Sequence, residues 1–175
     1  MQNDRPVHIV SDIQFDISLD ELSRRLKTSR TRTDLLTAAE KTLDHVQGHW
    51  RPAVLFKWFD FKLDPHQKSG LICHETDHTA LNLGCALPFL APAVQAMLCV
   101  YTIGDQLDQK AAACSTRGDL LDAYLIDQVG LLALEKTADH IKKAAELKAR
   151  KKGWGVSPFL SPGSVHGWEL EEQAR

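Results

Sequence analysis

The segment DLLDAYLIDQVGLLALEKTADHIKKAAELKARKK, residues Asp119–Lys152, is the longest periodic stretch of the chain. Leu121, Leu125, Val129 and Leu132 recur at the spacing of one face of an α-helix, which has about 3.6 residues per turn. The basic residues at its end suit the negative pole of a helix dipole. The pattern predicts one long helix in the C-terminal half of the chain.

The residues just before this helix predict a strand, a helix and a turn. Val94–Ile103 is apolar and bounded by Gly104, which is typical of a buried strand. Asp105–Ser115 has the composition of a helix, and Arg117-Gly118-Asp119 predicts a turn into the long helix.

The first half of the chain mixes strand and helix patterns. Ser18-Leu19-Asp20-Glu21 has the spacing of a capping box, in which the Ser and Glu side chains bond each other's backbone N–H groups. Further predictions are strands at Val7–Val10 and Gly70–Cys73, a helix at Asp34–Gln47, an apolar run at Ala53–Phe61 and a polar segment up to Gly84. Strands and helices interleave without regular βαβ spacing, so we expect an α+β protein. We expect one domain, residues 1–175, in which an antiparallel or mixed sheet packs with helices.

After the long helix comes a stretch rich in proline and glycine, Ser157–Gln173. Proline fixes φ and removes a backbone donor, and glycine permits conformations that other residues avoid. The pattern predicts a shaped loop, followed by a short polar helix from about Trp168. Such a loop can point its backbone groups at a ligand.

Three of these segments together resemble one protein family. They are Val100–Leu107, Ile126–Asp139 and the tail in which Ser161-Pro162-Gly163 precedes Gly167-Trp168-Glu169-Leu170-Glu171-Glu172-Gln173. In this order they resemble the activation domain of cobalamin-dependent methionine synthase and its free-standing bacterial relatives. The resemblance extends over roughly Val94–Gln173.

This resemblance implies an accessory function rather than an independent enzyme. The domain would bind S-adenosylmethionine and present it to a cobalamin (corrinoid) cofactor that a partner protein supplies, for reductive activation and remethylation. The implied partners are a corrinoid-binding protein or methyltransferase and an external reductant such as flavodoxin or ferredoxin. No catalytic base and no metal ligand of the chain itself is implied.

The resemblance also implies the binding residues. The glutamate that contacts S-adenosylmethionine in the family corresponds to Glu135, with Asp139 in a supporting role at most. The loop that wraps the ligand corresponds to Ser161, Pro162, Gly163 and Ser164. A carboxylate suits this ligand, which carries a sulfonium, an ammonium and ribose hydroxyls. Without the family, Glu135 and Asp139 are better explained as boundary carboxylates that pair with nearby lysines or water.

The chain departs from the family pattern at two points. Counted back from Pro162-Gly163, the arginine that grips the ligand carboxylate falls on Phe159, and no arginine lies between Arg150 and Arg175. This departure favours an alternative function, a docking module for a corrinoid protein that has lost S-adenosylmethionine binding. Relatives also continue into a further strand, so either the sequence is part of a longer chain or that strand is absent.

His74-Glu75-Thr76-Asp77-His78 matches the HExxH signature of zinc hydrolases. That chemistry needs both histidines on one helical face. The motif follows an apolar strand pattern, and on a strand its histidines would stand about 13 Å apart, too far for one zinc ion. We expect a polar turn here, and a zinc hydrolase is the weakest of the three functions.

Composition sets the remaining bounds. With 21 Lys and Arg against 23 Asp and Glu, the net charge of −2 gives no electrostatic case for nucleic acid. No apolar run approaches the length of about 20 residues that a membrane span needs. The first residues lack the apolar core of a secretory signal, and the 4 cysteines form no CxxC pair. We therefore expect a cytoplasmic protein with no membrane contact.

Overall fold

The computed structural model describes residues 6–27, 33–64, 69–73, 78–81, 83, 85, 87–164, 166 and 168–171. The chain forms two compact units, which we call the sheet unit and the helical unit. The sheet unit comprises Met1–His8, Leu55–Val100 and Lys142–Arg175, and the helical unit comprises Ile9–Val54 and Tyr101–Ile141. The grouping of residues 1–175 as a single domain stays a prediction.

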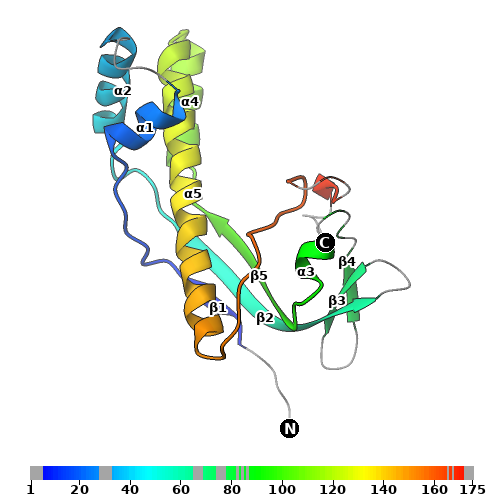
Figure 1. Cartoon of the computed structure of the whole chain (residues 1–175). Coiled ribbons are helices and arrows are strands. Elements are labelled where there is room, and N and C mark those ends of the chain that lie inside the picture. Colours follow the sequence, from blue (N-terminus) through cyan, green and yellow to red (C-terminus); the bar gives the residue numbers. More distant parts are fainter. Residues whose placement is uncertain are drawn as a thin grey trace. The chain divides into compact units, whose positions relative to one another are not determined.

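The order of elements confirms the α+β class (Figure 1). Along the described residues they are β1 (His8–Val10), α1 (Leu19–Arg25), α2 (Thr33–Val46), β2 (Ala53–Asp64), β3 (Ser69–Cys73), β4 (His78–Leu81), α3 (Leu87–Leu90), β5 (Gln95–Thr102), α4 (Gln106–Arg117) and α5 (Leu120–Arg150). The long helix predicted in the C-terminal half is α5, with 31 residues.

The strands form one sheet in the order β1-β2-β3-β4, with β5 also pairing with β2. The pairs β2–β3 and β3–β4 are antiparallel, with Asp60 opposite Cys73 and Cys73 in turn opposite His78. Strand β2 continues past the predicted apolar run as far as Asp64. Strand β4 was missed, since it lies in the segment expected to be polar and irregular.

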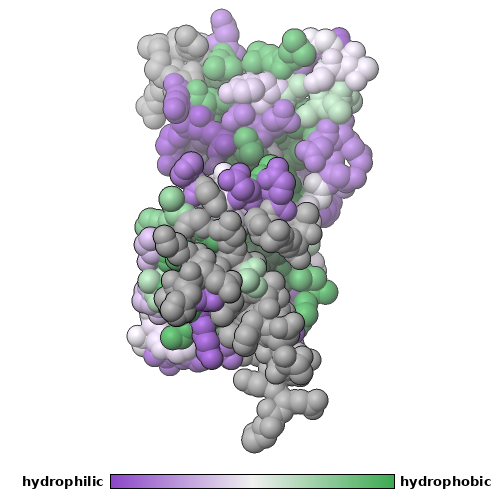
Figure 2. Space-filling model, turned by 90° about the vertical axis from the view of Figure 1, so that its right-hand side faces the viewer, coloured by the Kyte–Doolittle hydropathy of each residue, from purple (hydrophilic) through white to green (hydrophobic). Residues whose placement is uncertain are grey.

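The prediction of a buried strand at Val94–Ile103 was correct about the strand and wrong about its burial. Side chains of β5 alternate between half-buried and exposed from Met97 onward, and Val100 is 73% exposed. Antiparallel sheets commonly leave one face open to water, which gives this alternation. Figure 2 shows hydrophobic and hydrophilic residues interspersed on the face of the molecule that it presents.

The helical unit is built on one face of α5. Leu125, Val129 and Leu132 are buried, as the periodicity predicted, whereas Leu121 is 50% exposed. Helices α1, α2 and α4 contribute further residues to this core, including Leu22, Ala39, Leu43, Val46, Leu107, Ala111 and Cys114. The unit therefore packs three helices around the N-terminal two thirds of α5.

Helix ends in this unit follow local chemistry. Ser18 and Glu21 form the predicted capping box at the start of α1. Gly118 adopts φ of 85° between α4 and α5, and its N–H and that of Asp119 bond back to Ser115 and Cys114. A left-handed residue of this kind ends a helix with its last carbonyls satisfied.

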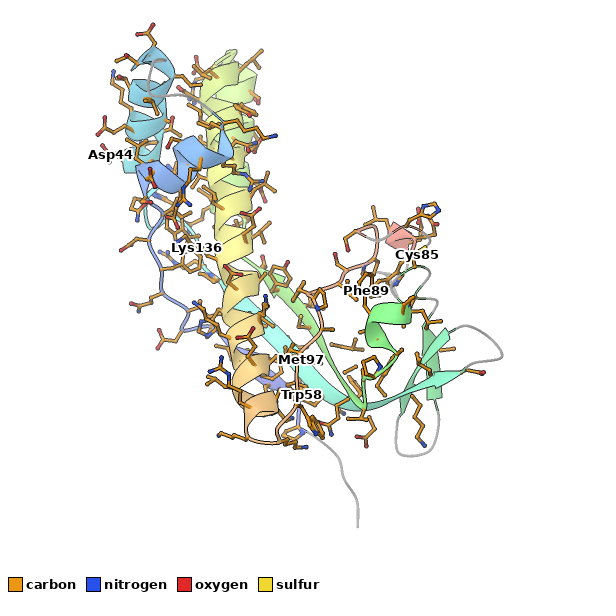
Figure 3. The ribbon with its side chains drawn as sticks, in the orientation of Figure 1. Asp44, Trp58, Cys85, Phe89, Met97 and Lys136 are labelled. Atoms are coloured by element: carbon orange, nitrogen blue, oxygen red, sulfur yellow. The ribbon has the colours of Figure 1, made fainter. Side chains whose placement is uncertain are left out.

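The sheet unit has a smaller core. Phe61 and Leu83 are buried, and partly buried residues pack against them from β2, from α3, β5 and their connection, and from the C-terminal segment: Phe59, Leu63, Leu87, Leu90, Ala93, Ala96, Leu160 and Trp168. At the end of α5, Lys148 Nζ lies 3.8 Å from the centre of the Trp58 ring. Trp58 and Met97 are labelled in Figure 3 on the paired strands β2 and β5.

Candidate functional site

Glu135 lies on α5 in the helical unit, with 61% of its side chain exposed. Its Oε1 atom accepts a hydrogen bond of 2.6 Å from Arg25 Nη1 on α1. The lysines expected as partners do not take this role, because neighbouring Lys136 pairs with Glu21 instead. Asp139, one turn further along α5, is exposed. The predicted binding carboxylate is thus at the surface and held from a second helix.

Arg25 completes a small polar cluster with α5. Its Nε atom donates to Gln128 Oε1 at 3.0 Å, while Nη1 is engaged with Glu135. Gln128 and Glu135 are seven residues apart, two turns of one helical face. The Arg25 side chain is 24% exposed, so its guanidinium plane is fixed against the helix while part of it still meets solvent.

A second ion pair joins the same two helices. Lys136 Nζ donates to Glu21 Oε1 at 2.6 Å, and both side chains are only about a quarter exposed, at 27% and 28%. Lys136 is labelled in Figure 3. The bond from Lys136, followed by the backbone bond from Ser18, lowers the pKa of Glu21 from 4.5 to about 2. Glu21 therefore stays ionised and ties the start of α1 to α5.

The predicted loop contains a tight turn, Ser161–Ser164, in the sheet unit. Ser164 N donates to Ser161 O at 3.0 Å, and Gly163 has φ of 80°. Proline in the second position and a left-handed glycine in the third are the signature of a type II turn. A Cβ at Gly163 would lie 3.1 Å from Leu170 Cδ1, so glycine is favoured by space as well as by conformation.

The backbone donors of this turn are used within the chain. Ser161 N donates to Ser164 Oγ at 3.0 Å, Gly163 N donates to Trp168 O at 2.7 Å, and Ser164 N closes the turn. Pro162 has no N–H to give. In this conformation the turn therefore has no spare N–H group with which to grip a ligand carboxylate.

The turn is anchored to the core of the sheet unit. Leu160 and Trp168, on either side of it, pack against the cluster around Phe61 and Leu83. Cys85 N donates to His166 O at 3.0 Å, and Figure 3 labels Cys85 and Phe89 beside this segment. The Trp168 Nε1 donor is buried without a hydrogen-bond partner among the described residues. Phe159, at the family's arginine position, is 39% exposed.

The two parts of the predicted site belong to different units, Glu135 to the helical unit and Ser161–Ser164 to the sheet unit. Within the helical unit, Arg25 bonds to both Glu135 and Gln128, a contact that the sequence did not predict. Arg25 and Glu135 are 110 residues apart. No local spacing could have joined them, because a pairing across two helices depends on how the helices pack.

The HExxH match does not form a zincin helix. His78 begins β4 and pairs with Cys73 across an antiparallel ladder, while residues 74–77 lie outside the described part of the chain. A zincin needs both histidines on one helix, so the strand at His78 contradicts it. Within the described residues, no group of three or more His, Cys, Asp and Glu side chains could hold a metal ion.

Among the described helices, none combines the length and the apolar character needed to cross a membrane.

Among the comparisons with known proteins, the comparison of structures gives a match. No protein-family model matches the sequence. No curated protein matches it either. The crystal structure of the MetH reactivation domain bound to AdoHcy is similar to this chain, with a TM-score of 0.50 and 16% sequence identity. The similarity covers 97% of this chain and 62% of that chain, so this sequence spans less than two thirds of that structure's length. The chain has the fold of the MetH reactivation domain.

Proposed function

We propose that this chain is an S-adenosylmethionine-binding accessory domain for the reductive reactivation and remethylation of a corrinoid cofactor. The observation that carries the proposal is the fold likeness over 97% of the chain to a reactivation domain bound to AdoHcy. AdoHcy is what remains of S-adenosylmethionine after methyl transfer. The domain would be one component of a methyltransferase system rather than an independent enzyme.

The chemistry of the helical unit suits this ligand. Glu135 offers an exposed carboxylate, and a carboxylate can accept hydrogen bonds from an ammonium or from ribose hydroxyls. When bound, S-adenosylmethionine supplies the methyl group. The protein's part is to bind the ligand, orient it and exclude water from it.

We propose that the turn Ser161–Ser164 presents a fixed surface to the ligand. Its type II geometry is fixed by Pro162, Gly163 and the Ser164 side chain, and its flanks are anchored in the core of the sheet unit. Because the described N–H groups of the turn are engaged, we propose that Ser161–Ser164 contact the ligand through surface shape and carbonyl oxygens. Ligand recognition through N–H donors would require the turn to open.

Calorimetry with S-adenosylmethionine tests the proposal. Wild-type protein should bind at micromolar concentration. Glu135→Gln keeps the size of the side chain and removes its charge, so it should weaken binding about tenfold, the loss of one charge-assisted hydrogen bond. Glu40→Gln, an exposed carboxylate on α2, is the matched control and should bind like wild type. Absence of binding by wild type at millimolar ligand would contradict the proposal.

A second candidate function is a docking module for a corrinoid protein that does not bind S-adenosylmethionine. Two observations favour it: Phe159 stands at the position of the family's carboxylate-binding arginine, and the described N–H groups of the turn are occupied internally. This function predicts association with a corrinoid-binding protein that is indifferent to added S-adenosylmethionine.

The partners follow from the proposed chemistry. A corrinoid-binding protein or methyltransferase would supply the cobalamin, and a separate reductant such as flavodoxin or ferredoxin would supply electrons. We propose that these encounters take place in the cytoplasm. Co-sedimentation of the chain with a cobalamin-loaded domain, with and without S-adenosylmethionine, separates the two candidate functions.

A further inference from the structure

We infer that Arg25 and Glu135 form a recognition site for the α-amino-acid head group of the ligand, in which Arg25 takes the place of the arginine missing from the loop. The inference rests on the proposed function, since it names how the helical unit would hold S-adenosylmethionine. Both residues lie in the helical unit, so the proposed site lies within one compact unit.

The charges of Arg25 and Glu135 are complementary to those of an amino-acid head group. An amino-acid head group carries a carboxylate and an ammonium on the same carbon atom. Arg25 and Glu135 present a guanidinium and a carboxylate in direct contact, with 2.6 Å between Nη1 and Oε1. A zwitterion laid beside this pair meets opposite charges on both sides, because its carboxylate faces Arg25 and its ammonium faces Glu135.

The ion pair leaves hydrogen-bonding groups of both side chains available to a ligand. Arg25 uses Nη1 for Glu135 and Nε for Gln128, and among the described residues its Nη2 group has no partner. Glu135 uses Oε1 alone, and the rest of its largely exposed carboxylate faces solvent. A head group can therefore bind both residues without breaking the existing bond between them.

The guanidinium of Arg25 is held in place before any ligand binds. Gln128 Oε1 accepts from Arg25 Nε and fixes the plane of the guanidinium, which makes Gln128 a positioning residue. The Arg25 side chain is only 24% exposed, so it loses little conformational entropy when a ligand binds. A planar guanidinium held in this way suits a carboxylate better than a lysine ammonium would.

The neighbouring ion pair shows that docking of α1 does not depend on Arg25 alone. Lys136 and Glu21 join the same two helices through another 2.6 Å bond, with both side chains more buried than Glu135. The pair of Arg25 and Glu135 is the one with an accessible carboxylate. Lys136→Gln is therefore a matched control that weakens helix docking without touching the proposed head-group site.

Two ligands isolate the head group. S-adenosylhomocysteine carries the amino acid, and 5′-methylthioadenosine keeps the adenosine and the thioether but lacks it. Calorimetry on wild type should give tighter binding of S-adenosylhomocysteine. Arg25→Gln should lower that affinity about tenfold or more, the loss of a charge-assisted contact, and leave 5′-methylthioadenosine within about twofold. Arg25→Lys should recover part of the loss, and Lys136→Gln should keep the wild-type ratio of affinities.

The outcomes separate this inference from the proposed function. If wild type binds and Arg25→Gln leaves the ratio of the two affinities unchanged, the head-group site is wrong and the proposed function stands. The same holds if both affinities fall by one factor, because Arg25 would then act only through the fold. If wild type binds neither ligand, the proposed function and this inference both fail.

Discussion

At the scale of single residues, Glu21 has two structural tasks. Its Oε2 atom accepts from Ser18 N at 2.9 Å in the capping box, and its Oε1 atom accepts from Lys136 at 2.6 Å. A hydrogen-bonded and paired carboxylate is stabilised in its ionised form. This is why the pKa of Glu21 falls from 4.5 to about 2, the lysine being the largest cause.

The lowered pKa of Glu21 predicts a pH-dependent contribution to stability. In the unfolded chain the carboxyl titrates near 4.5, and in the folded protein near 2. Its contribution is therefore complete above about pH 5 and is lost as the pH falls toward 2. At pH 7, Glu21→Gln should lower the free energy of unfolding by about 2 kcal/mol. At pH 3 the difference between the two proteins should be clearly smaller.

Urea denaturation of both proteins at the two pH values checks this. Glu40→Gln, exposed on α2, should show no such change with pH. If wild type and Glu21→Gln differ in free energy of unfolding by the same amount at pH 7 and pH 3, the role given to the ionised carboxylate is contradicted.

Residue-level prediction from sequence worked where the interaction was local. The capping box of Ser18 and Glu21 spans four residues of chain and formed as expected. The ion pair of Arg25 and Glu135 bridges 110 positions and was not foreseen. Local hydrogen bonds follow from spacing, but contacts between helices follow from packing.

At the scale of elements, the turn Ser161–Ser164 is the part of the loop whose sequence dictates its geometry. Proline and glycine in its central positions select type II, and Gly163 N bonds to Trp168 O. Residues of the turn carry the proposed contacts to the ligand, so its rigidity matters for function.

Gly163→Ala should destabilise this turn through two effects, the positive φ of 80° and the approach of the new Cβ to within 3.1 Å of Leu170 Cδ1. We expect a loss of about 1 to 2 kcal/mol, measured by thermal unfolding. Gly153→Ala shares a positive φ of 68° but meets nothing within 4 Å, so it isolates the conformational effect. Equal losses in the two variants would show that the contact with Leu170 contributes nothing.

Helices were predicted well because the spacing of their apolar residues repeats over several turns, and α5 shows this best. Strand β4 was missed because His78-Thr79-Ala80-Leu81 is too short and too polar to alternate clearly. The exposed side of β5 was missed for another reason. Its apolar side chains include Leu98 and Val100, which face away from the core although their residue types indicate burial.

At the scale of the whole molecule, the fold could be inferred from a few motifs in order, although overall identity to the similar structure is 16%. The motifs lie in the second half of the chain, and the likeness in structure extends to 97% of it. The contact between Arg25 and Glu135 could not be inferred in the same way, because it depends on how α1 packs against α5.

The central claim is that the helical unit binds S-adenosylmethionine at Glu135. Amide NMR during a titration with S-adenosylhomocysteine tests it most directly, and a chain of 175 residues is small enough for the experiment. The account predicts that signals around Arg25, Gln128 and Glu135 shift with one common dissociation constant in the micromolar range. Absence of shifts around these residues at millimolar ligand would contradict it.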